Sequence, residues 1–208
     1  MMHAVMSSPR VGPYTAMKYG TDGLVAARNR VAEGFLKSGV EWLFWCDTDM
    51  GFTADTIDRL LADADPDERP IVGALCFANR EIHTDGYGGF RHKPVPTLYE
   101  WVEQDDGSSG FSPLWSYPRD SLVRVAATGS ACLVIHRSVF ERVAERHGPT
   151  WYARMTNPTT GQLLGEDLSF CARAAEVGAA VWVDTSIKTT HLKAVYLQED
   201  DYEHPGGE

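Results

Sequence analysis

Two aspartates separated by one residue, Asp47 and Asp49, directly follow an apolar run of strand length, Trp42–Cys46. Acids after a strand are often ordinary turn residues, because turns favour Asp and Asn. At the periodicity of a regular strand, however, both carboxylates would point to the same side and repel each other unless a cation or a donor lay between them. The pair therefore indicates a metal site at the end of a strand, with a simple turn as the alternative.

A calcium loop is a second alternative for this segment. In "DTDMGFTADTID" the two aspartates would take positions 1 and 3 of a twelve-residue loop. Such a loop needs an oxygen ligand at position 5 and glycine at position 6, where Gly51 and Phe52 stand instead. Mg²⁺ or Mn²⁺, which prefer oxygen ligands and keep positions open for substrate phosphates, fits the pair better than Ca²⁺.

The elements that must position this pair alternate along the chain. Periodicity and capping residues predict helices over residues 21–38, 54–64, 138–148 and 165–178. Gly39 is expected to end the first helix, Thr53 to cap the second, and Ser138 with Glu141 to form a capping box on the third. Apolar runs predict strands over residues 3–10, 42–46, 71–77, 122–129, 131–137 and 179–186. The run at 42–46 is apolar throughout, which is typical of a strand buried on both faces. The alternation predicts one α/β domain with a mostly parallel central sheet flanked by helices.

Residues 80–120 differ from the rest by their many glycines, prolines and aromatic residues. The "DDGSSG" turn predicts a small antiparallel hairpin insertion in this region. Its aromatic side chains could shape an acceptor site, fill a core or cover the interface of a homodimer. We expect the domain to span residues 1–195. The acidic residues 196–208 lack an apolar face and are expected to form a flexible tail.

Composition narrows the classes of function. The net charge of −10 disfavours broad binding of nucleic acids, whose phosphates an acidic surface repels. No apolar run approaches the roughly 20 residues of a membrane span, and the N-terminus does not have the pattern of a signal peptide. The four cysteines are widely spaced within apolar runs, which is typical of buried thiols in a reducing compartment. These features favour a cytoplasmic protein.

Four segments occur in the order in which GT-A glycosyltransferases, particularly family-2-like enzymes, carry theirs. They are "LFWCDTDMGF", "VRVAATGSACLVIHRSVFE", "GEDLSFCARAAEVG" and "VWVDTSIKTTHLK". The chain resembles this family over most of residues 21–195. The resemblance implies a single GT-A domain of Rossmann-like architecture. It also implies a metal-dependent enzyme that moves a hexosyl group from a nucleotide sugar to an acceptor hydroxyl.

The resemblance also assigns roles to particular residues. It implies that Asp47, Asp49 and His191 hold Mn²⁺ or Mg²⁺. It implies that Asp167 is the general base, with Glu166 as the second choice. The physics agrees, because the start of a helix stabilises negative charge, although such acids can also merely cap the helix. Whether the transfer inverts or retains the anomeric configuration stays open.

The donor would be a UDP- or GDP-linked sugar. The residues expected to contact it are Ser8, Pro9, Arg10, Arg28, Asn29, Asp47, Thr48, Arg80, Gly129 and Lys188. An arginine in the middle of a helix, such as Arg28, more often lies on a solvated face. Only 46 residues precede Asp47, and residues 1–20 contain no acid, whereas family members usually read the base with a carboxylate there. We therefore expect a shortened nucleotide-binding half.

The acceptor hydroxyl could belong to a glycan, a protein, a small molecule or a modified base, and the acidic charge disfavours the last. The resemblance also covers phage-encoded enzymes that act in the host cytoplasm. Two other functions stay open. A nucleotidyltransferase would need a glycine-rich basic loop near the N-terminus, of which "SSPRVGPY" is a poor version. A non-catalytic protein that binds nucleotides or carbohydrates could retain the same fold.

Overall fold

The computed structural model describes residues 10–12, 22–83 and 90–193. The strand expected over residues 3–10 and the acidic tail over 196–208 lie outside these residues, apart from Arg10. Within the described part, the chain forms a mixed α/β structure with a central sheet, four helices and two antiparallel hairpins.

The central sheet has five strands in the order β1-β10-β3-β11-β8. They span Trp42–Cys46, Cys132–His136, Ile71–Leu75, Val181–Lys188 and Leu122–Val125. Only β3 and β11 pair in parallel, so the prediction of a mostly parallel sheet is wrong. The reason lies in β10, which begins with Cys132 opposite Cys46 at the end of β1 and therefore runs back between β1 and β3.

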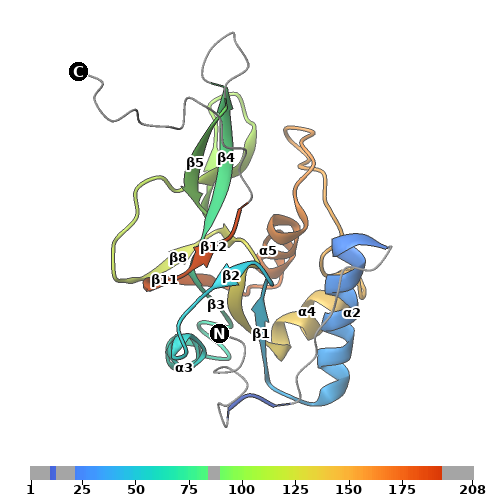
Figure 1. Cartoon of the computed structure of the whole chain (residues 1–208). Coiled ribbons are helices and arrows are strands. Elements are labelled where there is room, and N and C mark those ends of the chain that lie inside the picture. The colour runs from blue at the N-terminus through green and yellow to red at the C-terminus, as the bar shows by residue number, and fades with distance from the viewer. Residues whose placement is uncertain (1–9, 13–21, 84–89, 194–208) are drawn as a thin grey trace, which may run out of the picture.

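The sheet is covered on both faces, as Figure 1 shows. Helices α2 (Gly23–Ser38), α4 (Arg137–His147) and α5 (Glu166–Glu176) pack on one side of it, and α3 (Thr56–Asp63) packs on the other. Successive residues of a strand point to opposite faces. In β3, Ile71 and Leu75 accordingly belong to the core under the three helices, and Val72 and Ala74 belong to the core under α3.

Strand β1 contributes to both cores but is less buried than predicted. Its five side chains are all half-buried, because β1 is the edge strand of the sheet and pairs only with β10. The strand that carries the aspartate pair therefore lies at the rim of the domain, where a ligand can reach its end.

Helix ends follow the predictions to within about three residues, with two differences at caps. Helix α3 begins at Thr56 after Asp55, not after Thr53. Helix α4 begins at Arg137, and the side chain of His136 accepts the hydrogen bond from the backbone N–H of Ser138. The capping box predicted for Ser138 is therefore wrong, because the histidine before the helix takes over the capping role.

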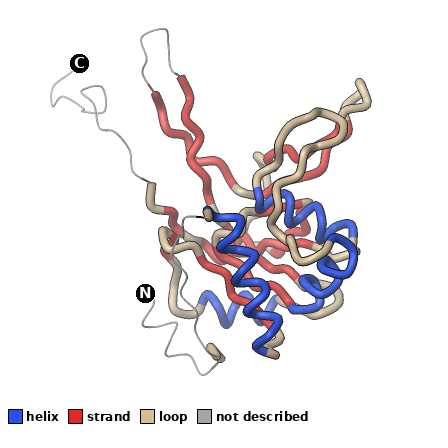
Figure 2. Tube along the Cα trace, turned by 90° about the vertical axis from the view of Figure 1, so that its right-hand side faces the viewer, coloured by secondary structure: helices blue, strands red, loops and turns tan. Residues whose placement is uncertain are grey.

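The hairpins leave the sheet after β3. Strands β4 (Phe77–His83) and β5 (Phe90–Pro96) form the first, which projects beyond the sheet in Figure 2. Strands β6 (Leu98–Glu103) and β7 (Ser109–Pro113) form the second, around the predicted "DDGSSG" turn. The single strand predicted over residues 122–129 is two strands, because β9 (Ala127–Thr128) leaves the central sheet to pair with β6.

The four cysteines are free thiols, three of them buried and Cys46 half-buried. Burial raises the pKa of Cys76 and of Cys171 to about 12, so both are protonated and unreactive at neutral pH. Within the described residues, no helix combines the length and the apolar character that a bilayer span requires.

Two carboxyl groups meet on the α3 side of the sheet. Asp63, the last residue of α3, hydrogen-bonds the carboxyl group of the buried Asp184 on β11. Burial, and after it the charge of Asp184, raises the pKa of Asp63. An acid with a raised pKa stabilises the fold below the pKa of the unfolded chain, and this contribution is lost as the pH rises through the folded pKa.

We therefore expect Asp63→Asn to stabilise the protein at pH 7 by up to about 1 kcal/mol, since an uncharged amide also suits the end of a helix better. Thermal unfolding should show a Tm higher by about 2–4 °C at pH 7, and the gain should shrink at pH 3.5. Asp67→Asn, at an exposed position, is the matched control and should leave Tm unchanged. An unchanged Tm for Asp63→Asn at pH 7 would mean that the charge of Asp63 beside Asp184 does not destabilise the fold.

Candidate functional site

The aspartate pair lies in a tight turn that a second chain segment closes. The backbone N–H of Asp47 donates to the carbonyl of Ala131 at 2.9 Å, and that of Met50 donates to the carbonyl of Asp47 at 3.1 Å. Strand β2 (Met50–Gly51) then pairs with β12 (Thr190–His191). This short two-stranded sheet sets His191 beside the turn, as predicted from the order of the motifs.

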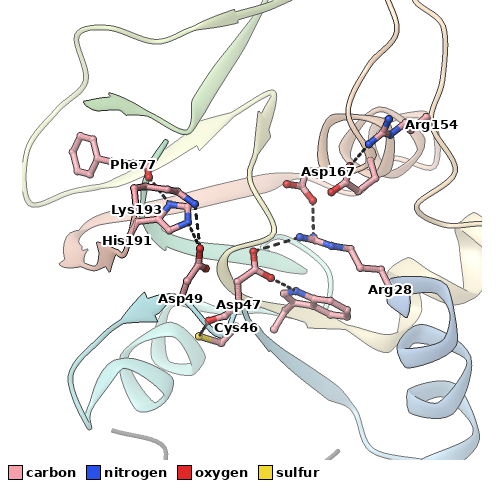
Figure 3. A network of polar contacts seen from close by, with 11 residues as sticks. Arg28, Cys46, Asp47, Asp49, Phe77, Arg154, Asp167, His191 and Lys193 are labelled. Carbon is pink, nitrogen blue, oxygen red and sulfur yellow. Dashed lines mark hydrogen bonds and ion pairs between the residues drawn. The ribbon is translucent and has the colours of Figure 1, made fainter. Parts of the chain in front are cut away.

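His191 and Asp49 form the clearest candidate for a cation site. The Nδ1 atom of His191 lies 2.7 Å from the carbonyl oxygen of Phe77, and Nε2 lies 3.1 Å from Oδ2 of Asp49 (Figure 3). A carbonyl only accepts, so Nδ1 must donate, and in a neutral ring Nε2 then turns a lone pair toward the carboxylate. Two acceptors face each other in this way only if the ring is protonated or a cation lies between them.

Lys193 also points at this pair, with its Nζ atom 3.1 Å from the same Oδ2 of Asp49. Burial by itself would raise the pKa of Asp49, but the hydrogen bond from Lys193 and the charge of His191 outweigh it and lower that pKa. The carboxylate is therefore kept ionised, which is the form that ligates metals.

Asp47 turns away from Asp49 toward helix α2. Its Oδ1 atom accepts from Nε1 of Trp45 at 3.3 Å, and its Oδ2 atom lies 3.5 Å from Nη2 of Arg28. Residues 47–49 form a turn and not a strand, and the two carboxylates have different partners, Arg28 and Trp45 for Asp47 and His191 and Lys193 for Asp49. Within the described residues, no three His, Cys, Asp or Glu side chains are grouped so that they could hold a metal ion.

Arg28 joins the aspartate turn to the start of α5. Its side chain is only 3% exposed, and its Nη1 atom donates to Oδ1 of Asp167 at 2.5 Å. The guanidinium lies 5.2 Å from the ring centre of Trp45 and 5.5 Å from that of Tyr152. Arg28 is therefore a buried cation between two carboxylates and two aromatic rings, and not a residue of a solvated helix face.

Asp167 stands in the first turn of α5 with its side chain 28% exposed. Burial raises its pKa, against the opposing charge of Arg28. Arg28 occupies Oδ1, and Oδ2 lies opposite Gly129, where a Cβ atom would lie 3.8 Å from Oδ2 and 3.6 Å from Cβ of Thr97.

Glu166 points elsewhere. It is buried, and its Oε2 atom lies 3.8 Å from Nη2 of Arg154 (Figure 3). Of the two acids that open α5, Asp167 is therefore the one connected to the aspartate turn.

Of the other residues predicted to contact the donor, some lie at this site and others do not. Exposed Thr48 lines an open depression of about 440 Å³ together with Asp49 and His191. Asn29 instead accepts a hydrogen bond from the backbone of Tyr152 at 3.0 Å, a structural contact.

Lys188 pairs with Asp120 at 3.1 Å and lines a different cavity, of about 250 Å³. Arg10 lies 3.4 Å from Asp58 of α3. Ser8, Pro9 and the side chain of Arg80 lie outside the described residues.

Sequence reasoning missed several partners of the site. Lys193 follows His191 by two residues and Trp45 precedes Asp47 by two, and this spacing was a usable signal in both cases. Tyr152 and Arg154 lie in a loop without regular periodicity, so no local pattern pointed to them.

No protein-family model and no curated protein matches the chain. Among solved structures, the chain is similar to the crystal structure of GalNAc-T7 with UDP, GalNAc and Mn²⁺, at 14% identity and a TM-score of 0.48. That similarity covers 81% of this chain but only 30% of the other. It is also similar to the crystal structure of A197 from STIV, at 13% identity and a TM-score of 0.43, over 82% of this chain and 68% of the other. Because both TM-scores are below 0.5, neither likeness bears on the chemistry of the site.

Proposed function

We propose that this protein is a metal-dependent glycosyltransferase with a GT-A domain. The observation that supports it most is the ion-pair network around Arg28. This network joins Asp47 of the Asp-x-Asp turn to Asp167, which is 139 positions from Arg28 in the sequence. His191 reaches the same turn across 142 positions. Motifs that resemble those of one family are thus linked by side-chain contacts to one turn.

The metal site would consist of Asp49 and His191, with Asp47 as the third predicted ligand. Two carboxylates and an imidazole suit Mn²⁺ or Mg²⁺. The ion would neutralise charge on the leaving nucleoside diphosphate of a UDP- or GDP-sugar. The carbonyl of Phe77 accepts from Nδ1 of His191, so a neutral ring would present the lone pair of Nε2 to the ion.

Asp167 would act as the general base of an inverting transfer. Its Oδ2, which Arg28 does not occupy, takes the proton of the acceptor hydroxyl while the acceptor oxygen bonds to the anomeric carbon and the bond from that carbon to the diphosphate breaks. Arg28 holds Oδ1 and so orients the carboxylate. Burial, which raises the pKa of Asp167, makes it a better proton acceptor than an ordinary carboxylate.

The remaining contacts with the donor stay predictions. They are those of Ser8, Pro9, Arg10, Arg28, Asn29, Thr48, Arg80, Gly129 and Lys188. A cytoplasmic location, a phage origin and a homodimer also stay predictions.

Binding of the donor should depend on the metal. A thermal-shift screen of UDP- and GDP-sugars is expected to find a donor that raises Tm with Mn²⁺ and not without it, because binding to the native state stabilises it by mass action. Asp49→Ala should abolish the shift, and exposed Asp67→Ala should keep it. An equal shift for the wild type and Asp49→Ala would refute the metal site.

The products identify the reaction. Release of UDP or GDP with glycosylation of an acceptor supports a glycosyltransferase, whereas release of pyrophosphate would identify a nucleotidyltransferase. Donor binding with no turnover of any acceptor, and no hydrolysis, would identify a non-catalytic binding protein.

A further inference from the structure

Strand β6 leads outward from the proposed base. Thr97, just before the strand, lies beside Gly129, and Leu98 pairs with Thr128. Tyr99 follows; it is half-buried and lies two residues beyond Thr97, so it belongs to the same face of the chain as Thr97. The start of β6 therefore lies beside the proposed base.

One face of the β6–β7 hairpin is aromatic. Tyr99 and Trp101 are two residues apart and so lie on the same face, with Pro113 and Phe111 opposite them on β7. Trp101 and Phe111 are in edge-to-face contact, at 5.1 Å between ring centres and an angle of 86°. Phe111 thereby fixes the indole of Trp101, which is nevertheless 45% exposed. Trp101 is thus a fixed and open indole, whereas Tyr99 and Phe111 beside it are half-buried and pack against the main core.

The charge of the hairpin restricts what can bind there. Residues 97–113 contain four acids and no Lys, Arg or His. The acids are Glu100, Glu103, Asp105 and Asp106. In a protein of net charge −10, this region repels phosphate and carboxylate groups. A nucleic acid, an anionic lipid and an acidic polysaccharide are therefore poor candidates for this surface.

We propose that the face formed by Tyr99, Trp101 and Phe111 binds the acceptor, and that the acceptor is an uncharged saccharide chain of two or more units. The apolar C–H face of a sugar ring packs on an exposed indole, and the hydroxyls at its rim stay in water. Two residues along a strand span about 7 Å, so a ring on Trp101 leaves a neighbouring unit near Tyr99 and Asp167. This inference rests on the proposed function, since it names the acceptor of that reaction.

Affinity electrophoresis tests the surface without donor or metal. Native gels would contain one neutral polysaccharide each: hydroxyethylcellulose, galactomannan, glycogen or xylan. We expect at least one to retard the wild type. Trp101→Ala should raise the dissociation constant for that polysaccharide by about tenfold. Trp115→Ala is the matched control, because Trp115 is 52% exposed and its ring packs under Lys93, and this variant should be retarded like the wild type.

The outcomes are separable from those for the glycosyltransferase itself. Retardation by none of the four gels, or equal retardation of Trp101→Ala and the wild type at equal Tm, would overturn the saccharide surface. So would a dimer of the wild type that Trp101→Ala converts to a monomer, because the face would then be an interface between copies. Turnover of a nucleotide sugar with Mn²⁺ but without gel retardation would leave the proposed function intact and remove only this inference.

Discussion

Replacing Arg28 with methionine is expected to lower the free energy of unfolding by about 2 kcal/mol. The change leaves the carboxylates of Asp167 and Asp47 without the cation that lies 2.5 Å and 3.5 Å from them. Removing one partner of a buried ion pair can cost about 3–5 kcal/mol, but both carboxylates keep part of their surface in water, which reduces the loss. Urea unfolding at pH 7 measures the difference.

The same helix offers a matched control. Arg30 pairs with Asp22 at 2.8 Å, but both side chains are exposed, so Arg30→Met should change stability by less than about 0.5 kcal/mol. Adding Asp167→Asn to Arg28→Met should recover part of the loss, since it removes the unpaired charge. Equal stability of Arg28→Met and the wild type would mean that the network does not hold the site together.

Asp167→Asn is expected to lower turnover by about 10²–10⁴-fold while donor binding changes by less than about twofold. The amide keeps the shape of the side chain and an oxygen for Arg28, but it cannot take up a proton. Turnover is measured at saturating donor with Mn²⁺, and donor affinity by the metal-dependent thermal shift. Glu166→Gln is the control, and a larger loss there would assign the base to Glu166.

The pH profile gives the same prediction a second test. Because burial raises the pKa of Asp167, wild-type turnover should fall on the acid side at a higher pH than an ordinary carboxyl group would give. This limb should be missing from the residual activity of Asp167→Asn. Turnover that is unaffected by the substitution would exclude a base role and agree with a retaining mechanism.

Local patterns predicted the elements better than their arrangement. Helix α2 ends at Gly39 in a left-handed conformation, as its glycine indicated, and α5 begins at Glu166. The direction of β10 could not be predicted, because an apolar run of five residues has the same pattern whichever way it runs. The exposure of β1 depends on its position at the edge of the sheet, which the order of the other strands decides.

At the site, too, some features could be predicted from the sequence and others depend on the tertiary arrangement. The order of motifs predicted that His191 would come beside the Asp-x-Asp turn, and it lies 3.1 Å from Asp49. The different partners of Asp47 and Asp49 depend on the turn between them, which strand periodicity does not describe. The burial of Arg28 depends on Trp45 and on Tyr152, which is more than 120 residues away, and helical periodicity contains no information at that range.

The pairing of β2 with β12 has a consequence for how the protein is made. A ribosome completes α2, β1 and the aspartate turn early, but it adds Thr190 and His191 more than 130 residues later. At about 5–20 residues per second, the nascent chain exposes the two acids for many seconds before their histidine exists. Pairing of β11 with β3 closes most of this loop, and β12 then adds two residue pairs and the contacts of His191 and Lys193, so this short last strand should dock after β11 and open before it. The site would thus be the final part of the molecule to form and the first to come apart.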